Sequence, residues 1–312
     1  MRVVFMGTPD FAVGTLEAVI EAGHEVVAVV TQPDKPKGRG GAMAMSAVKE
    51  AAIKHNLTVL QPQRARDEAF VEELASYQPE VIVVVAFGQL LPKSILDMPK
   101  YGCINVHASI LPKYRGAAPI QYAVIDGCQY SGVTTMQMDE GLDTGDILLV
   151  EKVELDPKET GGSLFNKLSV VGAKLLVDTL KAKEEGTIVP VKQDDSQATH
   201  VRTISKSYGK LEFSKDAVEI ERLIRGLNPW PSAYTSVSDK MLKIWDADVF
   251  DSIEDCVDAQ PGTVVKVDNH AFYVQCGKGL LKINEVQLEG KKRMNSADFL
   301  RGYQLSVGTT LV

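Results

Sequence analysis

The first thirty residues carry the pattern that most constrains the fold. An apolar run at 2–6 is followed by a helical spacing of apolar side chains at 11–22 and by a second apolar run at 25–30. A strand, a helix and a second strand in this order form a parallel βαβ unit, whose buried strands are apolar along their length. Thr8 suits the N-cap of this helix and Pro9 its first position. The pattern predicts an open, mostly parallel α/β sheet.

The turn after the first strand argues against a dinucleotide site. It reads Gly-Thr-Pro-Asp-Phe at 7–11 and lacks the fingerprint G-x-G-x-x-G, and the Asp10 carboxylate would repel a pyrophosphate. A nicotinamide dehydrogenase on a doubly wound sheet is therefore the weaker interpretation. The most apolar run, at 81–86, predicts the central strand, and the loop at 87–92 leaves its carboxyl end.

A polar pair follows the short strand predicted at 102–104. Asn105 and His107 are two residues apart, so their side chains lie on the same side of the sheet. The carboxyl ends of parallel strands are where ligands bind in such sheets. Asn105 can donate a hydrogen bond to a developing oxyanion, and His107 can move a proton beside it. A structural pair, with His107 buried against the backbone and Asn105 capping a turn, fits this stretch equally well.

A second stretch, at 136–146, favours the catalytic interpretation. It follows a β-branched run at 132–135 and contains several acids and two glycines. Its carboxylates would orient His107 if the two loops meet. Asp143 is the strongest candidate, because glycines two residues to either side make its loop sharp. The alternative is a solvated acidic turn, which Asp and Gly also build well.

These stretches resemble the folate-dependent formyltransferases. The resemblance rests on the segments 105–119 and 136–146 and on three further motifs, Gly-Thr-Pro-Asp-Phe at 7–11, Gln-Pro-Asp-Lys-Pro at 32–36 and Asn-Pro-Trp-Pro at 228–231. It covers nearly the whole chain and points to the members that act on methionyl-tRNA. It implies transfer of a formyl group from 10-formyltetrahydrofolate to the free α-amino group of initiator methionyl-tRNA, for use in translation initiation.

The resemblance also implies the site residues. The catalytic set is Asn105, His107 and Asp143. The folate is expected between two loops and near one acid, in contact with Phe87, Gly88, Leu90, Ser109, Ile110, Leu111, Pro112 and Asp139. No metal is expected, because the five histidines are scattered and the cysteines show no metal-ligand spacing.

A long loop at 31–46 is basic. Residues 31–49 hold four basic side chains and one acid, a net charge of +3. Long loops inside compact domains are usually functional, although a mobile solvated loop is the simpler interpretation of this sequence. The resemblance implies a loop that inserts into the tRNA acceptor stem through Lys35, Lys37 and Arg39. The lysine-poor segment at 41–47 departs from the family pattern.

The last third of the chain has a different pattern. We expect a catalytic domain at 1–186, a polar linker at 187–204 and a second domain at 205–312. Short β-rich segments with turn signals predict a small OB-like β-barrel, a common binder of nucleic acid. Lys291, Lys292 and Arg293 form a basic group, either a solvated face or, by resemblance, a tRNA surface. The net charge of −7 has the wrong sign for a general nucleic-acid binder.

Cysteine usage and hydropathy indicate the cellular compartment in which we expect the protein. Four cysteines lie far apart, which argues against a disulfide framework and fits a reducing compartment. No signal peptide and no run of membrane-spanning length is visible. We therefore expect a cytoplasmic protein with no membrane contact and no obligate protein partner.

Two further functions remain open. A glycinamide ribonucleotide or sugar-amine formyltransferase would keep the chemistry and change the acceptor, but the second domain, the basic loop and the motif at 228–231 argue against it. A non-catalytic RNA-binding module is the other alternative, and the complete Asn-His-Asp set argues against it.

Overall fold

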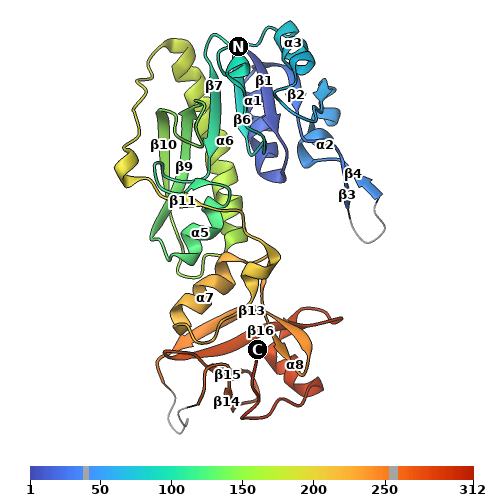
Figure 1. The fold of residues 1–312 in the computed structure, drawn as a ribbon, viewed down its shortest axis with the longest axis vertical. Coiled ribbons are helices and arrows are strands. Elements are labelled where there is room, and N and C mark those ends of the chain that lie inside the picture. Colours follow the sequence, from blue (N-terminus) through green and yellow to red (C-terminus); the bar gives the residue numbers. More distant parts are fainter. Residues whose placement is uncertain (38–41, 253–258) are drawn as a thin grey trace. The chain divides into compact units, whose positions relative to one another are not determined.

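The computed structural model describes residues 1–37, 42–252 and 259–312 (Figure 1). The chain forms two compact units. The first contains residues 1–119, 130–154 and 165–201, and the second contains residues 120–129, 155–164 and 202–312. Most of the segment expected to be a linker therefore packs within the first unit. The domain boundaries after residues 186 and 204 stay a prediction.

A seven-stranded sheet organises the first unit. Its strands are, in spatial order, β10 (Ile147–Glu154), β9 (Tyr130–Gln137), β7 (Cys103–His107), β6 (Val81–Val85), β1 (Arg2–Gly7), β2 (Glu25–Val30) and β5 (Val59–Leu60). Neighbouring strands from β7 to β5 pair in parallel. β9 pairs antiparallel with β7 on one side and with β10 on the other. The predicted open, mostly parallel sheet is confirmed, with the fully buried β6 near its centre.

Helices cover both faces of this sheet. On one face α3 (Glu68–Ser76) and α4 (Lys93–Leu96) share a buried cluster with alternate residues of β1 and β6. On the other face α1 (Val13–Glu21) packs beside α6 (Gly161–Glu185), where Gly14 faces Ser169. A Cβ at Gly172 of α6 would lie 3.1 Å from the Val106 side chain, so the helix approaches β7 closely on the face that carries Val106.

The first helix begins later than the sequence indicates. A 3-10 turn, η1 (Asp10–Ala12), precedes α1, and Thr8 caps neither. Its hydroxyl instead donates to the Phe87 carbonyl at 3.2 Å. The predicted N-cap is wrong. The 3-10 turn begins after Pro9, and the Thr8 oxygen accepts from the Gln32 amide at 3.3 Å, not from an amide of the helix.

The basic loop contains a short hairpin. β3 (Lys35–Lys37) pairs antiparallel with β4 (Ala42–Ala44), whereas the sequence predicted a structureless loop. Arg39 lies outside the described residues. The following helix, α2 (Ala47–Lys54), is capped by Ser46, with the Lys49 amide donating to its hydroxyl at 3.0 Å.

Three short elements complete the first unit. β8 (Arg115–Gly116) pairs in parallel with β11 (His200–Val201), and η2 (Asp195–Gln197) precedes β11. β11 lies in the segment predicted as a linker and is tied to the loop that follows β7.

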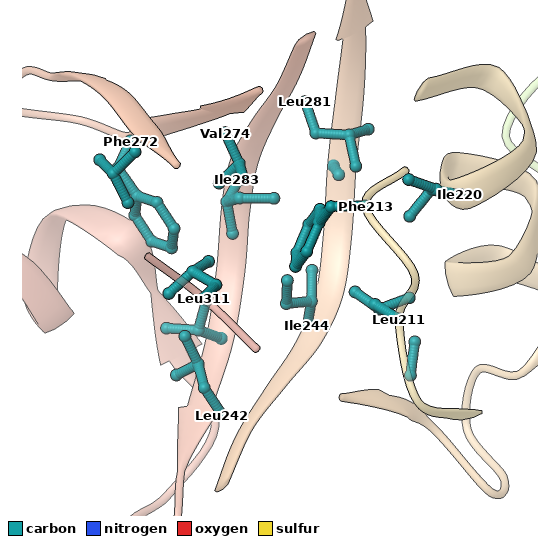
Figure 2. Close-up of a cluster of buried hydrophobic side chains, with 14 of the residues drawn as sticks. Leu211, Phe213, Ile220, Leu242, Ile244, Phe272, Val274, Leu281, Ile283 and Leu311 are labelled. Atoms are coloured by element: carbon teal, nitrogen blue, oxygen red, sulfur yellow. The ribbon is translucent and has the colours of Figure 1, made fainter. Parts of the chain in front are cut away.

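The second unit is built on a sheet in which two long strands, β13 (Lys240–Phe250) and β16 (Leu280–Leu288), pair with shorter ones. The strands are, in order, β12 (Ala233–Val237), β13, β16, β15 (Phe272–Gln275) and β14 (Val264–Val267), and β17 (Met294–Asn295) pairs with β16. The helices are α5 (Pro119–Ile125), α7 (Ala217–Gly226), α8 (Ser296–Gly302) and the 3-10 turn η3 (Lys206–Gly209). Figure 2 shows Phe213 and Ile220 lying with Ile244 and Leu281 in the core of this unit.

The strands of the second unit do not close a barrel by themselves. Within the described residues, β12 and β14 end the ordered path and do not pair with each other. The C-terminal segment bonds to both edges: the Ser236 amide donates to the Val312 carbonyl at 2.7 Å, and the Val264 amide to the Thr309 carbonyl at 2.8 Å. The sequence predicted a barrel, and what the structure establishes is a C-terminal β domain.

Candidate active site

β7 brings Asn105 and His107 to one face of the first sheet. Strand alternation turns both away from Val106, which faces α6. β6 pairs with β7 in parallel, with Val84 opposite Asn105, and β9 pairs antiparallel, with Thr134 opposite His107. The strand was predicted to end at residue 104, but β7 continues to His107, so both residues lie within it.

The ring of His107 is held from both nitrogens. The side chain is buried, and its Nε2 lies 2.9 Å from the Tyr114 carbonyl oxygen. A carbonyl oxygen only accepts hydrogen bonds, so Nε2 carries a proton. Nδ1 faces the Asp143 Oδ2 at 3.7 Å. A proton bound at Nδ1 would therefore place the positive charge of the ring at ion-pair distance from the Asp143 carboxylate.

Asp143 reaches His107 along an unexpected route. β9 is antiparallel to β7, so the acidic loop leaves the sheet beside Ile104 and not at the carboxyl end of β7. The loop returns to His107, and the Gly116 amide donates to the Asp143 Oδ2 at 2.8 Å. A Cβ at Gly145 would lie 1.7 Å from the Gln137 carbonyl oxygen, so this sharp return requires glycine there. The prediction that glycines constrain the loop is confirmed.

The other acid predicted in this loop serves its local structure. The exposed Asp139 accepts hydrogen bonds from the Gly141 amide at 3.0 Å and from the Thr144 hydroxyl at 2.7 Å. This is the arrangement expected of an Asp that stabilises its own turn.

Asn105 is half-buried, and its carboxamide makes no hydrogen bond to any of the described residues. A half-buried amide without an internal partner retains two N–H donors for a bound molecule. The pair Asn105 and His107 thus offers a free donor beside a group that can accept a proton.

The loop after β6 is fixed by backbone contacts. The Phe87 carbonyl accepts from the Thr8 hydroxyl and from the Gln32 side-chain amide, both at 3.2 Å. The Phe87 ring is 2% exposed and belongs to the core, while Leu90 is 74% exposed. Gly88 adopts a left-handed conformation, with φ 82°. A ligand would therefore meet the backbone here and the Leu90 side chain, not the Phe87 ring.

The loop after β7 is tied to β9. Thr134 donates from its hydroxyl to the Ser109 carbonyl at 2.7 Å and accepts from the Leu111 amide at 3.1 Å. The Ser109 hydroxyl donates to the Lys113 carbonyl at 2.6 Å. Ser109 and Leu111 are buried, and Ile110 and Pro112 are half-buried. The four residues predicted to bind folate lie on one hydrogen-bonded loop that directly follows Asn105 and His107.

The basic hairpin is anchored through an ion pair at its base. Lys49 Nζ lies 2.7 Å from the Asp34 Oδ2, and the Gln61 amide donates to the Asp34 Oδ1 at 2.8 Å. The hydrogen bond from Lys49 holds the pKa of Asp34 below its ordinary value. Lys49 is therefore neutralised within the fold, whereas Lys35 is exposed on β3.

The C-terminal basic group is not uniform. Lys291 and Lys292 are exposed. Arg293 donates from Nε to the Glu285 Oε1 at 2.6 Å, and its guanidinium lies 4.7 Å from the centre of the Trp245 ring. Arg293 is thus committed to contacts within its own unit.

Two residues that support the loop of Asp143 were not predicted. Gln193 donates to two carbonyls of the acidic loop, and Arg115 donates to Gln193. Gln193 lies in the polar stretch taken as a linker, where one glutamine among charged residues is no signal. Arg115 carried a weak signal, as a charged residue between Pro112 and Pro119 in a loop of small and apolar residues.

The described residues contain no cluster of His, Cys, Asp or Glu that could hold a metal ion. Across the same residues, no helix has the length and apolar character needed to cross a membrane.

Comparison with known proteins identifies the family. Residues 1–180 match the formyl transferase family, and residues 203–304 match the formyl transferase C-terminal domain. The chain is 69% identical to the methionyl-tRNA formyltransferase of Lachnospira eligens, over 100% of this chain and 99% of that protein. It is 59% identical to the methionyl-tRNA formyltransferase of Agathobacter rectalis, over 99% of both chains.

Two solved structures share the fold. The N-formyltransferase of Helicobacter canadensis, in complex with folinic acid and dTDP-3-aminofucose, matches with a TM-score of 0.65 at 17% identity, over 91% of this chain and 99% of that chain. HypX of Aquifex aeolicus, in complex with tetrahydrofolic acid, matches with a TM-score of 0.62 at 16% identity, over 98% of this chain and 48% of that chain. With both formyltransferase domains matched in order and close relatives along its whole length, the chain belongs to the methionyl-tRNA formyltransferases.

Proposed function

We propose that this chain transfers a formyl group from 10-formyltetrahydrofolate to the α-amino group of initiator methionyl-tRNA, and that Asn105, His107 and Asp143 carry out the transfer. The observation that carries the proposal is the free carboxamide of Asn105 on the same face as the buried His107, which is paired with the half-buried Asp143. The family fixes the reaction, and this arrangement supplies the groups that the reaction needs.

The chemistry follows from the protonation of His107. The neutral amine attacks the formyl carbon, and negative charge develops on the formyl oxygen, where the Asn105 amide donates. The amine loses a proton to Nδ1 of His107, because Nε2 is already protonated toward Tyr114. The same proton is then given to N10 of the folate as the carbon–nitrogen bond breaks. Asp143 stabilises the transient imidazolium at Nδ1. One well-placed donor to an oxyanion is commonly worth about 3 kcal/mol.

The folate is proposed to bind between the loops that follow β6 and β7. Phe87, Gly88 and Leu90 line one side, Ser109, Ile110, Leu111 and Pro112 line the other, and Asp139 lies on the loop of Asp143. Support comes from the parallel pairing of β6 with β7, which sets the two loops side by side at one edge of the sheet. Rigid backbone groups and the exposed Leu90 suit a flat ring that needs donors, acceptors and an apolar face.

The tRNA is proposed to contact the hairpin and the second unit. Lys35, Lys37 and Arg39 would act at the hairpin, and Lys291, Lys292 and Arg293 at the second unit. The hairpin is held at its base by the Asp34–Lys49 pair, which suits an element that must keep its shape against a partner. We further propose that the second unit is an OB-like barrel in which the segment 309–312 joins the two sheet edges. A cytoplasmic location and action without an obligate protein partner complete the proposal.

A single assay tests the function. The protein is incubated with 10-formyltetrahydrofolate and methionyl initiator tRNA, and the released amino acid is examined for formyl-methionine. Glycinamide ribonucleotide and an amino-sugar nucleotide are supplied in parallel as rival acceptors. Formyl-methionine from the wild-type protein and its loss in Asn105→Ala are expected. Faster formylation of either rival acceptor would assign the enzyme another substrate.

A further inference from the structure

We propose that Gln193 is a positioning residue for Asp143, and that Arg115 sets the orientation of the Gln193 amide. This inference rests on the function proposed for His107 and Asp143. It assigns a catalytic purpose to the stretch that follows α6, which the sequence marks only as a polar connection.

Gln193 holds the acidic loop at Asp143 and at Gly145. Its Nε2 donates to the Asp143 carbonyl at 2.8 Å and to the Gly145 carbonyl at 2.7 Å. A primary amide has two N–H groups, so both are used here. Asp143 itself adopts a left-handed conformation, with φ 55°, which a residue other than glycine keeps only when its surroundings hold it.

Arg115 determines which end of the amide faces the loop. Its Nε and Nη2 donate to the Gln193 Oε1 at 3.1 and 2.8 Å. A guanidinium only donates, so the amide oxygen must face Arg115 and the amide nitrogen must face the two carbonyls. Arg115 is 3% exposed, and its Nη2 also bonds to the Asp195 carboxylate at 2.7 Å. A cation buried this deeply is costly unless each donor is matched, which makes the orientation strongly defined.

The residues on either side of Arg115 contact His107 and Asp143. The Tyr114 carbonyl accepts from His107, and the Gly116 amide donates to the Asp143 carboxylate. The same strand, β8, is fixed to β11, with the Arg115 amide donating to the Thr199 carbonyl at 2.8 Å. The segment 193–201 therefore holds the support of His107 at one end and the loop of Asp143 at the other.

The geometry predicts a specific loss when this support is removed. Without Gln193, the Asp143 carboxylate keeps its bond from Gly116 but its backbone is free to rotate, and its distance to Nδ1 of His107 changes. A misplacement of about 1 Å costs roughly 100-fold in rate when it affects reacting groups. Folate and tRNA binding need no change, because Gln193 is buried behind the loop.

The test compares Gln193→Glu with Gln197→Glu. The first replaces both donors by a carboxylate that faces two carbonyls. The second makes the same chemical change in the same stretch, where the exposed Gln197 bonds to the Asp194 side chain. Single-turnover formylation of methionyl-tRNA and the KM for both substrates are measured, in the wild-type background and with Asp143→Ala. Gln193→Met, which keeps the length and loses the hydrogen bonds, is carried alongside.

We expect Gln193→Glu to lower the rate by about 10- to 100-fold with each KM within about twofold of the control. On the Asp143→Ala background the added loss should be under about twofold, because the residue acts through Asp143. An equal loss in both backgrounds, or a rate matching Gln197→Glu, would overturn the proposal. So would unfolding of both Gln193 variants by circular dichroism, because the residue would then support the fold as a whole. No product from the wild-type protein would instead reject the proposed function.

Discussion

At the scale of single residues, one hydrogen bond decides which nitrogen of His107 can exchange a proton. The Tyr114 carbonyl occupies Nε2, so Nδ1, which faces Asp143, is the nitrogen left for the proposed exchange with the substrate amine. Asn105 has the opposite character, because its carboxamide makes no hydrogen bond within the described residues. The two side chains should therefore respond differently to removal.

Asn105→Ala should lower kcat by about 100- to 1,000-fold, the usual cost of removing one oxyanion donor, and leave the melting temperature nearly unchanged. His107→Ala should lower kcat by at least as much and should also lower the melting temperature, because it removes a buried side chain bonded to Tyr114. Turnover and thermal unfolding of each variant check this. The losses of His107→Ala and Asp143→Ala should not add in the double variant, and fully additive losses would show that the two do not act together.

Two buried thiols should be inert at neutral pH. Burial raises the pKa of both Cys103 and Cys276 to about 12. The reactive species is the thiolate, so below this pH each group stays protonated and unreactive while the protein is folded. Treatment of the native protein with a thiol reagent at pH 7.5, followed by peptide mass spectrometry, should find neither residue modified. Both should react in denaturant, and rapid labelling of either in the native state would contradict their burial.

At the scale of elements, contacts between residues distant in sequence determine the features of the fold and of the site that local sequence patterns do not predict. The strands were predictable, because strands buried on both faces, such as β6, are apolar throughout. Asn105 and His107 were found by their spacing on one strand. Gln193 was missed because its partner Arg115 lies 78 residues away, and only the folded chain brings them together.

The two wrong local predictions have the same origin. Thr8 has the sequence of an N-cap, but its hydroxyl makes tertiary bonds, donating to the Phe87 carbonyl and accepting from the Gln32 amide. The stretch predicted as a free basic loop contains a short hairpin, and Lys49, which was counted with its cations, lies in α2 and is paired with Asp34. A charge count along the sequence overstated the charge that this element offers to a partner.

The hairpin should loosen when its anchor is removed. Asp34→Asn takes away the carboxylate that Lys49 binds, and we expect faster amide exchange in β3 and β4 and a higher KM for tRNA, with folate kinetics unchanged. The pKa of Asp34 is lowered by Lys49 in the folded protein, so the anchor is fully present above the ordinary value of 3.8 and is lost only as the pH falls through the lower folded value. The protection of the β3 and β4 amides in the wild-type protein should therefore not depend on the protonation of Asp34 from pH 5 upward.

Lys54→Met provides the control. It removes a cation from α2, the helix that also carries Lys49, at a position that makes no contact with Asp34. Unchanged exchange in β3 and β4 after Asp34→Asn would show that strand pairing alone holds the hairpin.

At the scale of the whole molecule, an acidic chain must bind an acidic partner. The net charge of −7 repels a polyanion at long range, so attraction has to come from cations that are not already paired. In the second unit this separates the basic group in two. All three side chains are exposed. Arg293 is bonded to Glu285 and lies over Trp245, whereas Lys291 and Lys292 have no ion pair within the described residues.

The salt dependence of tRNA binding should report this division. Each phosphate contact on a duplex stem contributes a slope of roughly −0.9 in the logarithm of affinity against the logarithm of salt concentration. Replacing Lys291 and Lys292 by glutamine should flatten the slope by up to about two contacts and leave the melting temperature unchanged. Arg293→Gln should change the slope less and lower the melting temperature, because it removes the hydrogen-bonded partner of Glu285 and a cation from the Trp245 ring. Binding titrations at several salt concentrations, with thermal unfolding of the same samples, measure both quantities. Equal slopes in the wild-type protein and the double-lysine variant would place the tRNA contacts on other residues.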